Sequence, residues 1–241
     1  MEWASAAGIG IILVIGSALQ RVTGMGLALV ASPFLTLVIG PDNGVLLLQA
    51  VGFFVCATSA WSLRADLNWA KAGILFLASM IGLLPGIGVA KSLPSSVLSI
   101  SVGIITVIAL ALIMLFRKSD FFAGRRGLVA AGSASGFMNV TAGVGGPPLV
   151  IYAASSGWKY QEYVATVQIL FAGMNLVSLA GRGLPSLSAP LWIVAALSAV
   201  CGLIAGNLAA EKINERAART AILVIAFIGA IAAIVRGISM P

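Results

Sequence analysis

The sequence has no histidine, only seven acidic residues and only two cysteines among 241 residues. The absence of histidine removes most metal sites and the side chain that most often serves as a general base. Without paired carboxylates or a nucleophile–base pair, an enzyme active site has no candidate residues. Cys56 and Cys201 lie within apolar stretches, which favours small buried side chains over a disulfide or a metal site. We therefore expect no catalysis, no cofactor and no bound metal.

Charged residues are scarce as well. They make up 9% of the chain, against 60% hydrophobic residues and a mean hydropathy of +1.10. This composition predicts an all-α, polytopic membrane protein, and the ten-residue alternating segments of a membrane β-barrel do not occur. The net charge of +7 does not indicate a nucleic-acid partner, because the basic residues cluster in loops, as membrane topology requires. The expected environment is a lipid bilayer.

Six uninterrupted apolar stretches are long enough, or nearly so, to cross a bilayer, which takes about 20 residues. They cover Gly44–Leu63, Ala72–Ala90, Val97–Phe116, Val164–Ala180, Ala189–Ala210 and Ala221–Val235. The last stretch spans only if Arg219 and Arg236 extend to the two interfaces. These stretches predict six membrane-spanning helices.

Two further apolar stretches are interrupted by polar residues and glycines. The interruptions are Gln20–Gly26, between Gly8–Leu19 and Leu27–Ile39, and Asn139–Pro148, between Leu128–Met138 and Leu149–Ser156. Each flank is too short to span a bilayer. Matched Gly/Pro-broken segments in the two halves of a membrane protein are the best sequence indication of a transporter's binding site.

The chain reads as two similar halves. A hydrophilic linker, 117–126, separates a first repeat, 1–116, from a second repeat, 127–241, and each repeat has one broken segment followed by three spans. An offset of 119 residues matches Gly24 with Gly143, Gly26 with Gly145, Val45 with Val164, and Gln49 with Gln168. The glutamine match is the most informative because the chain has only four glutamines.

Loop charges distinguish two topologies. If each broken segment crosses the membrane once, the 13 basic residues outside the first break divide eight to five. If each broken segment folds back as a hairpin, only Lys91, Arg182 and Arg236 lie on one side. The other side then holds Arg64, Lys71, Arg117, Lys118, Arg125, Arg126, Lys159, Lys212, Arg216 and Arg219. The positive-inside rule favours hairpins, a cytoplasmic linker, external termini and inverted repeats, although continuous spans remain an alternative.

The broken segments also supply the candidate site. Glycines there allow positive φ angles and close ligand approach, and a half-helix that starts at each break would present an anion site at its N-terminus. Arg21 is the only basic residue inside an apolar stretch and away from a loop, and no acid lies within the spans to pair with it. A guanidinium at membrane depth suits a planar, bidentate oxyanion. The neutral donors could complete an anion cage or could only bond neighbouring helices.

The predicted substrate-binding residues are Gln20, Arg21, Thr23, Gly24, Gly26, Gln49, Asn139, Thr141, Gly143, Gly145, Gly146 and Gln168. Asn175 is interpreted as a residue that joins helices rather than as part of the site.

The two motifs, Gly24–Pro33 and Thr141–Leu149, resemble those of the TauE/SafE family of sulfite and organosulfonate exporters. The resemblance covers the chain length and the two-half layout. The first motif departs from the family's glycine triplet at Leu27 and Ala28. The resemblance implies transport of a small sulfur-containing or carboxylate anion across a bacterial inner membrane.

We therefore expect a transporter that exports a small oxyanion, with an organosulfonate or sulfite favoured, through a midplane site between the two broken segments. An anion channel or a carboxylate permease of the same architecture is the alternative. Small-xxx-small pairs indicate close helix packing and a possible homodimer. They are Gly82/Gly86, Gly132/Gly136 and Gly202/Gly206.

Overall fold

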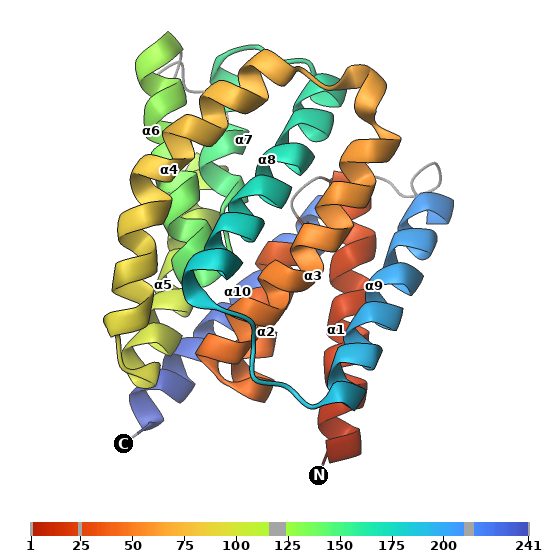
Figure 1. The fold of residues 1–241 in the computed structure, drawn as a ribbon, viewed down its shortest axis with the longest axis vertical. Coiled ribbons are helices and arrows are strands. Elements are labelled where there is room, and N and C mark those ends of the chain that lie inside the picture. Colours follow the sequence, from red (N-terminus) through yellow and green to blue (C-terminus); the bar gives the residue numbers. More distant parts are fainter. Residues whose placement is uncertain (1, 24–25, 116–123, 210–214, 241) are drawn as a thin grey trace.

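A computed structural model describes residues 2–23, 26–115, 124–209 and 215–240. Apart from one short 3₁₀ turn, the regular elements in these ranges are all α-helices (Figure 1). In chain order they are α1 (Glu2–Thr23), α2 (Gly26–Ile39), α3 (Pro41–Ser62), η1 (Arg64–Asp66), α4 (Trp69–Ser92), α5 (Ser95–Leu115), α6 (Gly124–Ala142), α7 (Gly146–Ser155), α8 (Tyr160–Arg182), α9 (Ala189–Ala209) and α10 (Glu215–Ser239). Helix α6 begins within the predicted linker 117–126, most of which lies outside the described ranges.

The chain is a multi-pass membrane protein. Six described helices, α3, α4, α5, α8, α9 and α10, are long and apolar enough to span a bilayer, and they coincide with the six predicted spans. Large apolar side chains such as Leu77, Leu115 and Ile193 are exposed on their outer faces. A surface of this kind is expected where helices face lipid rather than water.

The first broken segment forms a helical hairpin. Helix α1 continues to Thr23, so Gln20 and Arg21 are helical, and the predicted start of the break at Gln20 is wrong. Helix α2 turns back along α1, and a Cβ placed on Gly26 would lie 2.7 Å from the carbonyl carbon of Leu19. Glycine is therefore required by the close approach of the two helices. The turn itself, which contains Gly24, lies outside the described ranges.

The second broken segment is also a hairpin, with a break much shorter than predicted. Helix α6 extends through Asn139 and Thr141 to Ala142, and α7 begins at Gly146, so only Gly143–Gly145 lie outside helices. Gly143 has a φ of +73°, a conformation that glycine adopts without strain. The prolines at the start of α7 occupy its first turn, where a missing N–H costs nothing.

Small residues allow helices from the two halves to pack closely. Gly202 and Gly206 of α9 lie against α1. Gly82 and Gly86 of α4 lie against α6, and Gly132 and Gly136 of α6 lie against α4. The two helices of each pair run parallel, since the numbers of the contacting residues rise together along both helices. All three predicted small-xxx-small pairs thus pack against a neighbouring helix of the same chain, and the homodimer stays a prediction.

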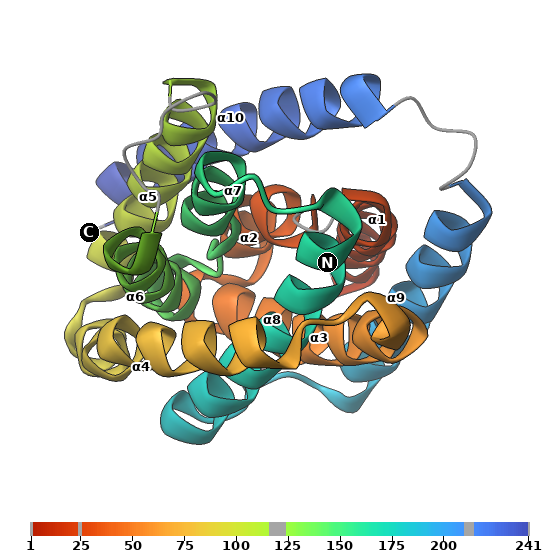
Figure 2. The same cartoon turned by 90° about the horizontal axis from the view of Figure 1, so that it is seen from above.

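Helices α3 and α8 cross antiparallel near the centre of the bundle (Figure 2), with Gly52 against Asn175 and Gln49 bonded to Ser178. One end of the bundle holds the start of α1, the start of α3 and the ends of α8 and α10; we call it the terminal end (Figure 1). The opposite end holds η1 and the starts of α4 and α8; we call it the η1 end.

Candidate functional site

A small cavity lies where the two hairpins meet, between α3 and α8. Its volume is about 30 Å³, enough to hold water. The lining residues come from α1, α2, α3, α6, the α6–α7 break, α7 and α8. They are Gln20, Leu27, Ala28, Leu48, Gly52, Cys56, Asn139, Gly143, Gly146, Phe171 and Asn175. Its polar lining consists of neutral amides and one thiol, with no charged side chain.

Gln20 organises the side of the cavity formed by the first hairpin. Its Nε2 donates to Oε1 of Gln168 at 3.1 Å and to Sγ of Cys56 at 3.6 Å. Its Oε1 accepts the backbone N–H of Leu27 at 3.3 Å. Because Leu27 lies in the first turn of α2, Gln20 caps the helix that follows its own. One backbone donor at this helix N-terminus is therefore occupied by the protein itself.

Asn139 organises the opposite side. Its Nδ2 donates to Oδ1 of Asn175 at 3.0 Å, and its carbonyl accepts Nε2 of Gln49 at 2.9 Å. Ser178 donates to Oε1 of Gln49 at 2.8 Å. The same Asn139 carbonyl accepts the N–H of Gly143 at 2.9 Å and so closes the end of α6. Buried carbonyls freed by the break are thus satisfied by side chains of α3 and α8, as a dry interior requires.

Two glycines make room for this arrangement. A Cβ on Gly52 would lie 2.8 Å from Nδ2 of Asn175, so any larger residue would displace that amide. A Cβ on Gly143 would lie 2.5 Å from Cδ2 of Leu48. These contacts fix the position of the asparagine amide and of the α6–α7 break relative to α3.

The helix N-termini offer fewer free donors than the sequence suggested. At α2 the Leu27 N–H is bonded to Gln20, and at α7 two of the first three residues are prolines without an N–H. Ser135 donates to the carbonyl of Gly145 at 2.6 Å and stabilises the turn. Side-chain amides therefore supply most of the polar groups around the cavity.

Arg21 does not line the cavity. Its Nε donates to Oδ1 of Asn207, and its Nη2 donates to Oγ of Ser62 at 3.1 Å. An amide and a hydroxyl therefore accept from the guanidinium, and the described part of the chain places no acid on it. It is half-buried toward the η1 end, one residue beyond Gln20.

Four of the twelve predicted site residues line the cavity, namely Gln20, Asn139, Gly143 and Gly146. Gln49 and Gln168 lie one hydrogen bond away, and Nε2 of Gln168 is buried without a partner among the described residues. Thr141 bonds the carbonyl of Phe137 in its own helix. Gly26 and Gly145 serve helix packing. Gly24 and the side chain of Thr23 lie outside the described part of the chain.

Cys56 and Asn175 line the cavity, although they are not among the predicted substrate-binding residues. The offset of 119 could have found them, because it relates Cys56 to Asn175. Their hydrogen bonds correspond too, since Gln20 donates to Cys56 and Asn139 donates to Asn175. Eight of the lining residues form four pairs at this offset: Gln20/Asn139, Leu27/Gly146, Gly52/Phe171 and Cys56/Asn175.

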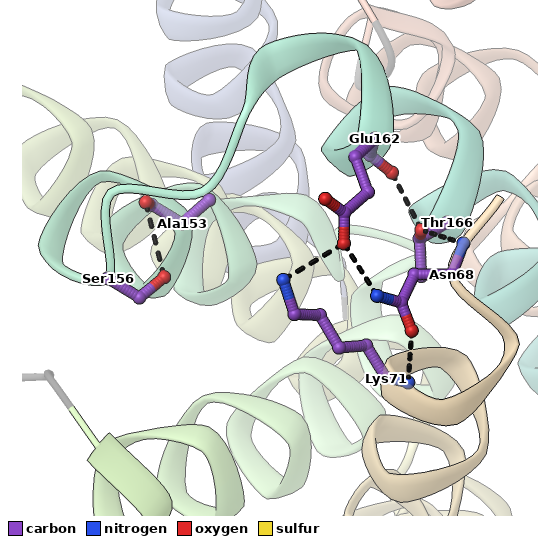
Figure 3. Close-up of polar contacts among 6 residues, drawn as sticks. All are labelled: Asn68, Lys71, Ala153, Ser156, Glu162 and Thr166. Atoms are coloured by element: carbon purple, nitrogen blue, oxygen red, sulfur yellow. Dashed lines mark hydrogen bonds and ion pairs between the residues drawn. The ribbon is translucent and has the colours of Figure 1, made fainter. Parts of the chain in front are cut away.

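Ion pairs lie toward both ends of the bundle. At the η1 end, Glu162 of α8 accepts from Nζ of Lys71 at 2.9 Å and from Nδ2 of Asn68 at 2.7 Å (Figure 3). Lys71 also lies 4.5 Å from the ring centroid of Trp158, and Thr166 accepts the N–H of Asn68. This cluster fixes the start of α4 to the start of α8.

At the terminal end, Arg182 closes α8. It donates to Oδ1 of Asp42 at 3.3 Å and to the carbonyl of Val140 at 2.7 Å. The loop that follows is held to the same place, since Oδ1 of Asn43 accepts the N–H of Ser186 at 2.9 Å. Helix α8 is therefore fixed at both ends by an ion pair to another helix.

The model of the TauE/SafE sulfite exporter family matches residues 8–233, nearly the whole chain. The chain belongs to the TauE/SafE family. Membership implies a membrane exporter of sulfite or organosulfonates, a transporter family rather than an enzyme family. Neither the curated proteins nor the solved structures give a match to the chain.

Proposed function

We propose that this TauE/SafE member exports a small sulfur oxyanion, an organosulfonate or sulfite, across a bacterial inner membrane, and that the substrate occupies the cavity between the two hairpins. The observation that carries the proposal is the position of the cavity. It joins the ends of both half-helices, at Gln20 and Asn139, to the centres of the crossing helices α3 and α8. Transporter sites occur at this kind of junction between broken helices.

Neutral amides are suitable ligands for such an anion. Gln20, Asn139 and Asn175 carry N–H donors that can bond sulfonate oxygens, and the absence of a buried charge among the lining residues allows the anion to leave again. The cavity is small, at about 30 Å³. We infer that passage of an anion through it requires the hairpins to separate from α3 and α8.

The two halves are inferred to be inverted repeats. In the two halves, α1 corresponds to α6, and α4 corresponds to α9. Helix α1 packs on α9, and α6 packs on α4, so the two contacts are equivalent. The paired lining residues at an offset of 119 extend this correspondence to the cavity. A site on the axis between inverted repeats can open alternately to the two sides.

Arg21 is proposed to attract the anion at the η1 end rather than to hold it in the cavity. It is half-buried and bonded to neutral partners, Asn207 and Ser62, and none of the described carboxylates pairs with its positive charge. A positive potential at a narrow opening raises the local concentration of anions.

The proposal is tested by transport in proteoliposomes. Uptake of radiolabelled methanesulfonate should saturate, and excess unlabelled sulfite or methanesulfonate should inhibit it more strongly than acetate or sulfate does. Flux that does not saturate, together with single-channel currents, would indicate the anion channel. Stronger inhibition by acetate would indicate the carboxylate permease. Replacement of Asn175 by Leu, which removes amide donors from the cavity, should reduce methanesulfonate uptake at least about tenfold.

A further inference from the structure

Arg182 is a buried charge that the site described above does not use. Its side chain is 3% exposed. Burial of a guanidinium in a membrane protein costs free energy. At the end of a membrane helix, an arginine side chain can usually avoid this cost by extending to water. Arg182 instead points into the protein, with one donor on the Val140 carbonyl at 2.7 Å and one on Asp42.

Its position relates it to the cavity. Val140 directly follows Asn139, and Arg182 lies seven residues beyond Asn175 on α8, about 10 Å along the helix axis. Arg21 has a corresponding place on the other side, because it bonds Ser62, six residues beyond Cys56 on α3, about 9 Å along that helix. Since α3 and α8 run antiparallel, the neutral cavity lies between two guanidinium groups.

The bond between Arg182 and Asp42 is suited to exchange. Its length of 3.3 Å exceeds the usual 2.7–2.9 Å of a charge-assisted hydrogen bond. Asp42 is 51% exposed, so its carboxylate can be hydrated after release. The buried guanidinium, in contrast, needs another anion once Asp42 leaves. A sulfonate or sulfite offers it negatively charged acceptor oxygens, as Asp42 does.

We propose that Arg182 binds the transported anion on the terminal-end half of the pathway, and that Asp42 closes this half when the anion is absent. The anion leaves the amide cavity, replaces the Asp42 carboxylate on Arg182 and then passes to water, after which Asp42 binds again. This inference rests on the proposed function for its substrate, although the closing role of Asp42 can be tested without one.

The native cysteines provide the test. In a Cys201→Ala background, Cys56 in the cavity is the remaining thiol. Its labelling by the anionic reagent methanethiosulfonate ethylsulfonate is measured from each membrane face, in right-side-out and inside-out vesicles. In the Asp42→Asn variant, Cys56 should be labelled at least about fivefold faster from the terminal-end face, because a neutral amide holds Arg182 less strongly. The labelling rate from the other face should be unchanged. Equal rates with and without the substitution would overturn the closing role.

Glu162→Gln is the matched control, since it neutralises the carboxylate of the ion pair at the opposite end. It should not speed labelling from the terminal-end face; an equal increase there would mean that any lost ion pair loosens the bundle, and would overturn the proposal. Arg182→Lys keeps the charge but not the planar guanidinium, whose two nitrogens donate to Val140 and Asp42. It should reduce methanesulfonate flux at least about fivefold with a normal melting temperature.

The outcomes separate the two proposals. If Asp42→Asn opens one face but the unsubstituted protein transports no oxyanion, the proposed function fails and the closing role stands. If the unsubstituted protein transports methanesulfonate and Arg182→Lys and Arg182→Gln both retain full flux, Arg182 only caps the end of α6, and the anion-binding role fails while the proposed function stands.

Discussion

At the scale of single residues, Asn139 has the most demanding position. Its amide bonds Asn175, and its carbonyl accepts from both Gln49 and Gly143, so it belongs to the cavity and to the break at once. Asn139→Asp would place a negative charge next to the anion and should reduce methanesulfonate flux at least about 100-fold, since like charges brought together cost several kcal/mol. Proteoliposome uptake measures this.

The matched variant is Asn139→Leu, which has a similar size and no charge. It removes the bond to Asn175 and should cost about tenfold in flux. If both variants lose the same amount, charge at this position has no part in the loss, and the anion does not pass near Asn139. Melting temperatures in detergent distinguish loss of transport from loss of fold.

Arg21 leads to a different prediction. Because it lies outside the cavity lining, Arg21→Ala should raise the KM for anion presented at the η1 end about fivefold or more while the maximal rate changes little. The effect should shrink at high salt, which screens a partly exposed charge. Arg21→Lys should restore part of the affinity. A fall in the maximal rate with an unchanged KM would place Arg21 in the cavity itself.

The sequence could identify Gln20 and Asn139 because each is a polar residue beside a glycine break in an apolar stretch. It could not identify Cys56 and Asn175 with the same reasoning, since a thiol and an amide within a helix usually serve packing. Whether they face a cavity depends on how α3 and α8 cross. For Arg21, sequence showed that no acid lies within the spans, but not that Asn207 of α9 accepts from it.

At the scale of elements, the two hairpins depend on glycine for different reasons. Gly143 combines a positive φ with a close contact to Leu48, so Gly143→Ala should destabilise the protein by roughly 2 kcal/mol or more. Gly88→Ala is the matched control: it lies inside α4 with open space around its Cβ position and should be neutral or slightly stabilising. Thermal unfolding in detergent measures both, and equal melting temperatures would contradict the assigned strain.

The predicted spans were confirmed because twenty-residue apolar stretches have few alternatives in a membrane. The ends of the broken helices were not predicted correctly. Polar residues such as Asn139 and Thr141 suggested that the helix had already stopped, yet both are helical. Their polar groups bond α8 and the preceding turn of α6, respectively. In a membrane interior, a helix can continue through polar residues when neighbouring helices provide partners.

At the scale of the whole molecule, the described basic residues separate between the two ends. Arg64 in η1, Lys71 in the first turn of α4 and Lys159 just before α8 lie at the η1 end. Arg182 and Lys91, in the last turns of α8 and α4, lie at the terminal end. We predict that the η1 end is cytoplasmic and that both termini are external, because the positive-inside rule places most basic loops in the cytoplasm. Single cysteines introduced at Lys159 and Ser239, in a protein without native cysteines, should react from opposite faces with an impermeant reagent. Reaction of Ser239→Cys from the cytoplasm would contradict the prediction.

The charge distribution also determines what can drive transport. The chain has no histidine, the cavity is lined by neutral residues, and the carboxylates of Asp42 and Glu162 lie at opposite ends of the bundle. The described lining therefore holds no carboxylate or imidazole that could carry a proton through the site. An anion that crosses on neutral amides carries its own charge, and an inside-negative potential drives it outward by about 2.3 kcal/mol per charge per 100 mV.

We therefore predict that transport follows voltage and not pH. In proteoliposomes with equal pH on both sides, a potassium diffusion potential should drive methanesulfonate toward the positive side, and reversal of the potential should reverse the flux. Methanesulfonate is suited to this test because it stays ionised across the neutral range, so a pH gradient cannot act through its own protonation. Accumulation driven by a pH gradient with the potential clamped would require a titrating group on the pathway and would contradict the assignment of a neutral site.

Because backbone carbonyls near Gly143 could still hold a cation, the same vesicles are compared with sodium and with choline outside. Equal fluxes in the two media are the expected result.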